Sequence, residues 1–522
     1  MDVKILLLLA IVGNAEICKG YRILALYPLP KQSHFMMINQ LLKGLAHKGH
    51  QVDLISVNTL PKSHPNYMQI MKLPDNADPI FSRYENIKNL HYNFSMMSWM
   101  GYLRCQKMEH PEFLNLARNP PKAPPYDVII VQMLNSHCYM ILGHLWNIPV
   151  VLVSTGSLYP WMYDMIGIPE NPAYISNNFA PIPEGNGLWT RIYNTYMFYY
   201  MKFNYLYYSR MQNQLLQKLF GPEVPTIREL ERNASLVLIN NYFPINGIRP
   251  TTAGLIEVGG LHIQNDGPEL SDKLKIWMNE SEKGIVYFSL GSIYTLDVFP
   301  AEIKKIIFTS LAKIAPMKVL MRLKSEKLSF KVPDNVLIMS WIPQEKVLQH
   351  PNVKVFITHA GLLGTQESIY YGVPMLCVPF AFDQWSNANN YVSKKIAVKV
   401  DLASVTQTKI DEALNEILTN PIYRENIRKY SRLFRDRPQK TIDTANYWIE
   451  YVIRNGKNSL RSATMDFTWW QIYLLDVYAV TVLGISMFLY FLIGIIKIFV
   501  RLFNLKNNKK TKKNNISKLK KR

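Results

Sequence analysis

Short apolar runs separated by amphipathic segments recur along the chain and predict alternating strands and helices. Arg22–Tyr27 and Gln51–Val57 are two such runs, and the segment Ser33–Lys48 between them ends at Gly49. Buried parallel strands are apolar throughout, whereas the helix that joins them needs only one apolar face. The pattern therefore predicts a βαβ unit that opens a doubly wound domain.

The alternation continues through the chain and predicts two domains of this kind, over residues 21–245 and 246–455. In the first domain, Asp127–Gln132 is a further expected strand, and Leu236–Asn240 is expected to close the sheet. In the second domain, strands are expected over Gly284–Leu290, Lys318–Leu323, Asn335–Ser340, Val353–Thr358 and Pro374–Phe380. A last helix near 441–455 is expected to return and pack on the first domain.

The two ends of the chain differ from this pattern. Residues 1–20 place a lysine before a short apolar run and predict a cleaved secretory signal, too short to span a bilayer. Residues 474–496 predict one transmembrane helix, preceded by an interfacial Trp469-Trp470 pair and followed by the basic tail 497–522. A basic flank favours the cytosol, so the preceding domains are expected in the lumen of the endoplasmic reticulum as a type I membrane protein.

Two smaller features bear on this placement. Lys518 and Lys520 near the end of the tail resemble a retrieval signal to the endoplasmic reticulum. Three Asn-x-Ser/Thr triplets, at Asn93, Asn233 and Asn279, would face the lumen as glycosylation acceptors.

Charge and cysteine content exclude some functions. The formal net charge is +21, but Arg501–Arg522 alone holds ten Lys or Arg and no acidic residue. The rest of the charge is dispersed, so no nucleic-acid site is expected. The cysteines other than Cys18 form no CxxC motif and no expected disulfide framework, and Cys377 is interpreted as a small core residue.

Polar and aromatic residues follow several predicted strands of the second domain. Trp341, His359 and the pair Asp383-Gln384 each stand just past such a strand. Ligands of open α/β sheets bind along the edge formed by the carboxyl ends of the strands. These residues are therefore expected to share one binding site.

The chemistry of these residues matches the parts of a nucleotide sugar. The turn after His359 precedes a helix expected over Thr365–Tyr371, whose positive end suits a diphosphate. Glu367, expected in the first helical turn, can accept hydrogen bonds from a ribose, and Trp341 offers a flat face to a base. Asp383 and its neighbour remain for a neutral, hydroxyl-rich sugar.

The motifs WIPQ at 341–344, THAG at 358–361, ES at 367–368, GVP at 372–374 and FDQ at 382–384 resemble the signature of the UDP-glycosyltransferases. That family moves sugar from a UDP-sugar to small lipophilic acceptors. The resemblance implies an α/β fold of GT-B type, with two facing Rossmann-like domains that hold acceptor and donor. It implies UDP-sugar contacts by Ser292, Trp341, Gln344, His359, Gly361, Gly364, Glu367, Asp383 and Gln384. Ala360 departs from the glycine usual in the family.

His34 is the candidate catalytic base. It stands at a helix start past the first strand, where the positive end of the helix disfavours a protonated ring. A histidine that only caps the helix is the alternative, but the family places its base in a loop resembling PLPKQSH. Relatives pair this histidine with an acid where Gln132 stands here, and some carry another acid where His137 stands. The orienting carboxylate is thus missing from its expected position.

The resemblance implies inverting transfer of a hexose, with the UDP-sugar as co-substrate and no cofactor. Asp383-Gln384 fits glucose, while glucuronic acid and galactose stay open. No cluster of His, Asp and Glu indicates a metal site. Stretches rich in Met, Tyr, Phe and Trp, at about 60–125 and 156–215, are expected to line an apolar acceptor pocket, partly against the membrane. A catalytically weak binding or partner protein is the alternative, favoured by Gln132. A homo-oligomer is compatible with the sequence.

Overall fold

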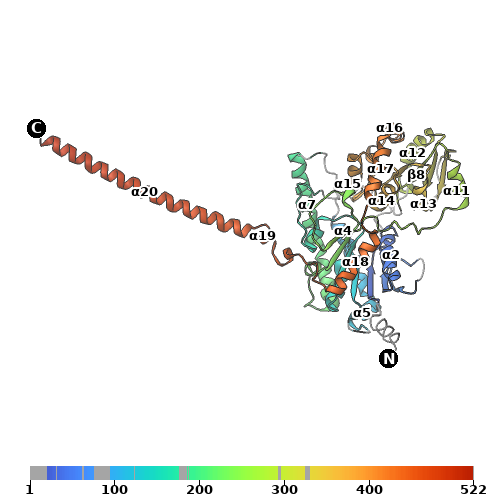
Figure 1. Cartoon of the computed structure of the whole chain (residues 1–522), viewed down its shortest axis with the longest axis horizontal. Helices are drawn as coiled ribbons and strands as arrows, with labels where there is room; N and C mark the ends of the chain where they lie inside the picture. Colours follow the sequence, from blue (N-terminus) through green and yellow to red (C-terminus); the bar gives the residue numbers. More distant parts are fainter. Residues whose placement is uncertain are drawn as a thin grey trace, which may run out of the picture. The chain divides into compact units, whose positions relative to one another are not determined.

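The computed structural model describes residues 20–520 except 31, 61–63, 76–93, 121, 123, 176–184, 186, 292–295 and 324–329. The expected signal segment up to residue 19, the acceptor Asn93 and the site residue Ser292 therefore lie outside the described residues. The chain divides into two units, residues 1–462 and 463–522, which are described separately (Figure 1).

The first lobe of the larger unit is built on a seven-stranded sheet in the order β3-β2-β1-β4-β5-β6-β7. The strands are β1 Arg22–Tyr27, β2 Gln51–Ser56, β3 Tyr67–Lys72, β4 Val128–Gln132, β5 Val150–Ser154, β6 Leu236–Ile239 and β7 Leu255–Glu257. All neighbouring strands are parallel. The prediction that β6 closes the sheet is wrong, because the short β7 pairs along its free edge.

The second lobe is built on a six-stranded parallel sheet in the order β10-β9-β8-β11-β12-β13. Its strands are β8 Ile285–Ser289, β9 Lys318–Arg322, β10 Val336–Met339, β11 Val353–Thr358, β12 Met375–Cys377 and β13 Ala397–Lys399. In both sheets the strand order reverses at one point, between β1 and β4 and between β8 and β11. The crevice at such a point is where doubly wound sheets bind ligands.

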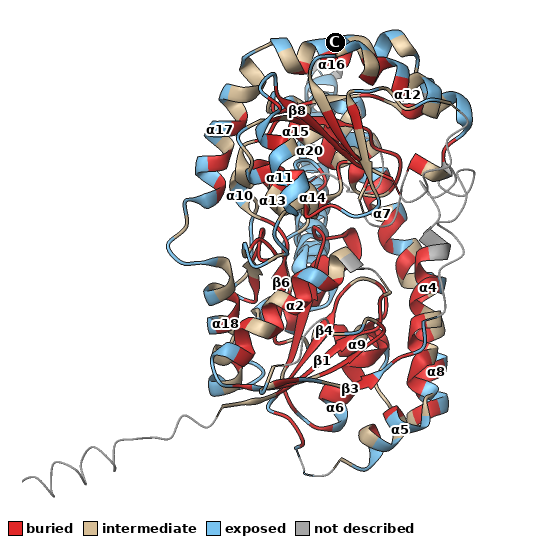
Figure 2. Cartoon of the chain, turned by 90° about the vertical axis from the view of Figure 1, so that its right-hand side faces the viewer, coloured by how far each residue is buried: buried red, intermediate tan, exposed pale blue. Residues whose placement is uncertain are grey.

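Helices cover both sheets. Those of the first lobe are α2 Gln32–His47, α4 Phe94–Gln106, α5 Pro111–Arg118, α6 Ile141–Leu145, α7 Leu188–Ser209, α8 Met211–Phe220, α9 Ile227–Arg232 and α10 Phe243–Asn246. Those of the second lobe are α11 Asp272–Asn279, α12 Ala301–Lys313, α13 Gln344–Gln349, α14 Leu362–Tyr371, α15 Gln384–Ser393, α16 Gln407–Thr419 and α17 Ile422–Arg435. Figure 2 shows buried strands between helices whose outer faces are exposed.

The helix α18 (Thr441–Asn455) returns from the second lobe to the first, as the sequence predicts. Ala445, Ile449 and Val452 are fully buried in the apolar cluster that covers one face of the first sheet. The helix packs against α2, where a side chain at Gly44 would collide with Ile442. The chain thus passes from the first lobe to the second and, through α18, returns to the first lobe.

The structure corrects the expectation that the cysteines form no disulfide. Cys105 at the end of α4 is bonded to Cys138 in the 3₁₀ helix η4 (His137–Met140) that follows β4. The sequence carries no spacing motif for this pair, since only the packing of α4 over the first sheet brings the two residues together. Cys377 is buried in β12 as a free thiol, which confirms its interpretation as a core residue.

The smaller unit holds α19 (Trp469–Ile472) and α20 (Leu475–Leu519). Within the described residues, the segment Leu475–Ser517 is the one helical stretch long and apolar enough to cross a membrane, with a mean hydropathy of 2.4 in its most apolar window. Its side chains are exposed, as suits a helix whose partner is lipid. The expected span 474–496 coincides with the apolar half of this helix.

Candidate functional site

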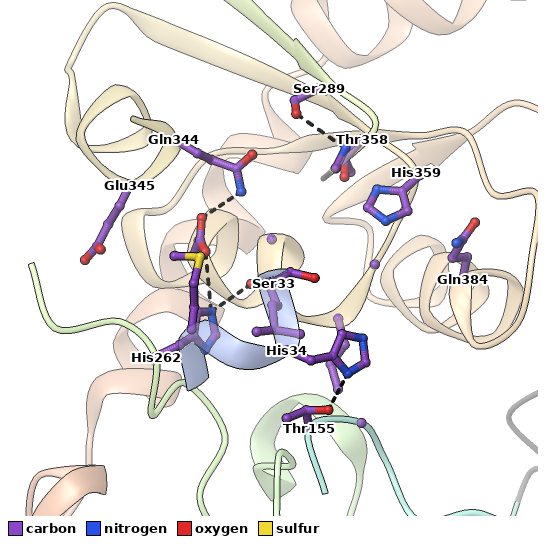
Figure 3. Close-up of a pocket in the computed structure, with 18 of the residues that line it drawn as sticks. Ser33, His34, Thr155, His262, Ser289, Gln344, Glu345, Thr358, His359 and Gln384 are labelled. Carbon is purple, nitrogen blue, oxygen red and sulfur yellow. Dashed lines mark hydrogen bonds and ion pairs between the residues drawn. The ribbon is translucent and has the colours of Figure 1, made fainter. Parts of the chain in front are cut away.

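A cavity of about 450 Å³ lies between the two lobes, and residues that follow the ends of several strands line it. His34 and Thr155 line it from the first lobe, and His359, Asp383 and Gln384 line it from the second (Figure 3). The apolar side chains Leu29, Met97, Met100 and Leu134 cover part of the first-lobe wall. The cavity therefore joins an apolar half to a polar half.

His34 is the third residue of α2, directly past β1, as the sequence predicts. Its Nδ1 lies 2.5 Å from Oγ1 of Thr155, which follows β5. When Nδ1 carries the proton and donates it to this hydroxyl, Nε2 keeps its lone pair and can accept a proton. The geometry thus supplies an oriented ring, although a hydroxyl stabilises an imidazolium less than a carboxylate does.

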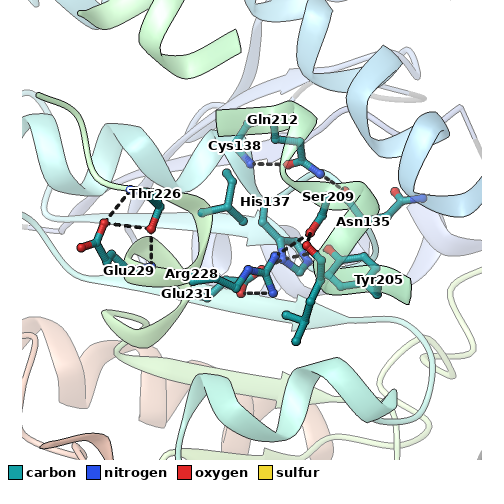
Figure 4. Close-up of polar contacts among 12 residues, drawn as sticks. Asn135, His137, Cys138, Tyr205, Ser209, Gln212, Thr226, Arg228, Glu229 and Glu231 are labelled. Carbon is teal, nitrogen blue, oxygen red and sulfur yellow. Dashed lines mark hydrogen bonds and ion pairs between the residues drawn. The ribbon is translucent and has the colours of Figure 1, made fainter. Parts of the chain in front are cut away.

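Neither of the two residues at the positions of the family acids lines the cavity. Gln132 is 2% exposed, and its side-chain oxygen and nitrogen have no hydrogen-bond partner in the described part of the chain. His137 is fully buried, where it pairs with Glu231, whose other oxygen lies 2.6 Å from Arg228 Nη1 (Figure 4). The orienting partner of His34 is thus Thr155, which sequence reasoning missed.

The helix α14 begins at Leu362 and not at the predicted Thr365, with Gly361 as its N-cap. The first N–H groups of a helix have no partner within it, so those of Leu362, Leu363 and Gly364 could donate hydrogen bonds to an anion. The preceding Ala360 has a φ of 64°, a left-handed conformation that favours glycine. The residue that departs from the family pattern therefore keeps the glycine-like backbone.

His359 lies against two glycines. A Cβ on Gly361 would stand 2.4 Å from Nε2 of this ring, and one on Gly291 would stand 2.6 Å from its Cε1. Desolvation by the surrounding protein lowers the pKa of His359 to about 4. Its Nδ1 is buried with no hydrogen-bond partner in the described residues, which suits a neutral ring with its proton on Nε2. Such a ring can donate one hydrogen bond into the cavity.

Glu367 lies in the second turn of α14, not in the first as predicted, because the helix begins earlier. Its Oε2 accepts a hydrogen bond from Gln344 Nε2 at 2.7 Å, and Gln344 Oε1 accepts one from the Tyr287 hydroxyl at 3.1 Å. On the other side, His262 Nε2 lies 3.5 Å from Glu367 Oε1 and 3.1 Å from the Leu363 carbonyl. His262 is a second residue that sequence reasoning missed.

Asp383 and Gln384 begin α15 at the carboxyl edge of the second sheet. Gln384 Oε1 accepts hydrogen bonds from the backbone N–H groups of Phe380 and Ala381, both at 3.0 Å, so the side chain is held in place. Burial raises the pKa of Asp383 to about 6, and its hydrogen bond with Asn387 opposes that rise. A carboxylate held in this way accepts hydrogen bonds from sugar hydroxyls readily.

Two further residues line the second-lobe wall of the cavity. Trp341 lines the cavity and is 55% exposed, so the face of its ring is available for stacking. Arg322 at the end of β9 lines the cavity as well, and its guanidinium donates to the carbonyl of Gly291. Among the described residues, the side chains of His, Cys, Asp and Glu form no group of three that could hold a metal ion.

Two parallel Rossmann-like sheets that face a shared cavity form a fold of GT-B type. Solved structures support this fold: Medicago truncatula UGT71G1, complexed with UDP-glucose, covers 84% of this chain and 100% of its own at a TM-score of 0.59 and 16% identity. The glycosyltransferase of kitacinnamycin covers 83% of this chain and 99% of its own at a TM-score of 0.56 and 18% identity.

Sequence relatives place the chain more narrowly. The profile of the family described as "UDP-glucoronosyl and UDP-glucosyl transferase" matches residues 25–513. UDP-glucosyltransferase 2 of Dactylopius coccus is 30% identical over 91% of this chain and 93% of its own. Human UDP-glucuronosyltransferase 2B15 is 30% identical over 86% of this chain and 87% of its own. The chain belongs to the UDP-glucuronosyl and UDP-glucosyl transferase family.

Proposed function

We propose that this enzyme transfers glucose from UDP-glucose to the hydroxyl group of a small lipophilic acceptor, with inversion at the anomeric carbon. The observation that carries the proposal is the shared cavity, which His34 lines from the first lobe and the pair Asp383-Gln384, proposed to bind the sugar, lines from the second. The apolar first-lobe wall suits a phenol or an alcohol. The similarity to UDP-glucosyltransferase 2 supports glucose as the sugar.

In the proposed reaction, Nε2 of His34 takes the proton of the acceptor hydroxyl as its oxygen attacks the anomeric carbon. The bond between that carbon and the diphosphate oxygen breaks, and UDP leaves with the electron pair. The N–H groups at the start of α14 and the Nε2–H of His359 meet the new charge on the diphosphate. The UDP-sugar is a co-substrate in this scheme, which uses neither a cofactor nor a metal.

The other donor contacts in this proposal follow from position. Trp341 stacks on the base, Glu367 and Gln344 bind the ribose, and Gly361 and Gly364 let the diphosphate approach the backbone. Ser292, outside the described residues, is proposed as a further diphosphate contact. The lumen of the endoplasmic reticulum is the proposed location, with one membrane-spanning helix and a cytosolic tail. The Cys105–Cys138 disulfide supports an oxidising compartment.

A binding or partner protein on the same scaffold is the second candidate. The buried Gln132 favours it, because no carboxylate stands at that position to stabilise a protonated His34. Incubating the full-length protein with UDP-glucose and a panel of phenols separates the two functions. Release of UDP that depends on the phenol supports the transferase, whereas binding of both ligands without UDP release supports the second candidate.

A further inference from the structure

The turn that carries Thr155 is fixed by an asparagine at the end of the neighbouring strand. Asn240 follows β6, which pairs with β5, and its Nδ2 donates to the carbonyl of Thr155 at 3.0 Å. Its backbone N–H donates to the carbonyl of Ser154 at 3.0 Å. Asn240 is fully buried, and Thr155 is 2% exposed. Thr155, which orients His34, is therefore itself held by hydrogen bonding to a buried residue.

The same asparagine is hydrogen-bonded to the donor helix of the other lobe. Gln366 on α14 donates from Nε2 to the backbone carbonyl of Asn240 at 3.1 Å. The N–H of Gly260, on the chain that crosses between the lobes, lies 3.0 Å from Gln366 Oε1 and 3.3 Å from Asn240 Oδ1. Gln366 is also fully buried. Three segments thus meet in one buried and well-paired cluster.

Gln366 stands next to Glu367 on α14, and the two side chains leave the helix about 100° apart. Glu367 faces the cavity and contacts Gln344, whereas Gln366 faces the first lobe. A shift of this helix on donor binding therefore moves both residues together. Three hydrogen bonds, joined through the covalent frames of Asn240 and Thr155, connect Gln366 on this helix to the ring of His34.

We propose that Asn240 and Gln366 are positioning residues that couple the donor-binding helix to the catalytic histidine. Neither residue lines the cavity, and each acts through Thr155. The inference rests on the proposed function, since it requires His34 to act as the base. Displacing a catalytic group by about 1 Å can lower a rate about a hundredfold, so a modest loosening of this cluster lowers turnover while the donor still binds.

The variant Gln366→Leu keeps the approximate size of the side chain and removes both of its hydrogen bonds. We expect kcat to fall about tenfold and the dissociation constant for UDP-glucose to stay within twofold. Asn240→Asp puts an oxygen in place of the nitrogen that donates to the Thr155 carbonyl. We again expect a lower kcat with an unchanged dissociation constant for UDP-glucose. Gln40→Leu is the control, because it removes a hydrogen bond between Gln40 and Asp266 that is not part of this cluster. It should leave kcat unchanged.

A double-mutant cycle separates positioning from a general structural role. If Gln366 acts through Thr155, then adding Gln366→Leu to Thr155→Val lowers kcat little beyond the single Thr155→Val variant. Multiplied losses in the double variant, or a loss of UDP-glucose affinity equal to the loss of kcat, overturn the inference. If Gln366→Leu fails to fold, Asn240→Asp takes its place in the cycle. Absence of turnover in the wild type would instead refute the proposed function.

Discussion

The pairing of His34 with a hydroxyl is the residue-scale feature that sets this chain apart from the family pattern. The distance of 2.5 Å from Nδ1 to Thr155 Oγ1 fixes the plane of the ring. In hydrolases with a comparable histidine, the partner sets the tautomer and stabilises the charged ring. Thr155 can set the tautomer of His34, but its hydroxyl stabilises the protonated ring only weakly. The base is therefore oriented without a carboxylate to stabilise its charge.

The first prediction concerns this hydroxyl. Thr155→Val keeps the shape of the side chain and removes the partner of Nδ1, so the ring can rotate and the tautomer is no longer fixed. We expect kcat to fall between about tenfold and a hundredfold, with UDP-glucose affinity unchanged. Steady-state kinetics with a phenol and calorimetry with the donor measure the two quantities. A full retention of kcat would show that Thr155 does not orient the base.

The second prediction concerns the raised pKa of Asp383, about 6. Sugar hydroxyls donate to the ionised carboxylate, so donor binding favours loss of this proton and weakens as the pH falls below 6. Between pH 7 and pH 5, affinity for UDP-glucose should fall about tenfold at most. His359, with a pKa of about 4, stays neutral throughout this window.

The variant Asp383→Asn is the control for this titration, because the amide carries no charge at any of these pH values. Its affinity for UDP-glucose should be the same at pH 5 and pH 7. The linkage to folding has the opposite sign: a carboxyl whose pKa is raised in the folded state favours the native protein when protonated. Asp383 therefore lowers the free energy of unfolding as the pH rises from about 4 to 6. If the affinity of Asp383→Asn for UDP-glucose depends on pH as that of the wild type does, Asp383 is not the group that titrates.

At the scale of elements, the start of α14 is the part of the site with the tightest geometric demand. Gly361 caps the helix and lies under the ring of His359, where a Cβ would stand 2.4 Å from Nε2. The third prediction is that Gly361→Ala displaces this ring and weakens UDP binding by about tenfold or more. Gly187→Ala, at an N-cap where a Cβ meets nothing within 4 Å, should leave UDP binding unchanged. Equal affinity in both variants would remove His359 from the diphosphate site.

Most elements could be predicted from the sequence because their patterns are local. The apolar run Val353–Thr358 coincides with β11, and the amphipathic segment near 441–455 coincides with α18. The sequence predicts the start of α14 three residues late, at Thr365, because the N-cap is Gly361 and not a residue with a capping side chain. Short edge strands such as β7 carry too few residues for a periodic pattern.

Only those site residues whose type and position next to an apolar run mark them in the sequence could be predicted. His34, His359 and Asp383 stand just past apolar runs, and the structure brings them to one cavity. Thr155 and His262 share this cavity, but threonine and a lone histidine carry no motif that separates them from other loop residues. The contact of Asn240 with Gln366 spans 126 positions of sequence, so only the folded chain reveals it.

At the scale of the whole molecule, the chain combines a two-lobed unit with a separate C-terminal helix. The fourth prediction is that truncation after Ser462 releases the remaining unit from membranes on alkaline carbonate extraction, while the full-length protein stays in the pellet. Helix α7 carries exposed aromatic side chains, among them Trp189, Tyr196 and Phe203. Retention of the truncated protein in the pellet would contradict the prediction that α20 is the sole anchor, and would direct attention to this helix.

In the proposed mechanism, the second lobe binds UDP-glucose and presents its anomeric carbon to His34. The most direct test compares phenol-dependent UDP release by the full-length wild type with that of His34→Ala, alongside UDP-glucose binding to both. A general base contributes roughly 10²–10⁴ in rate. We expect a loss of that size in the variant, with unchanged binding of UDP-glucose. Undiminished transfer by His34→Ala, or no binding of UDP-glucose by the folded wild type, would contradict it.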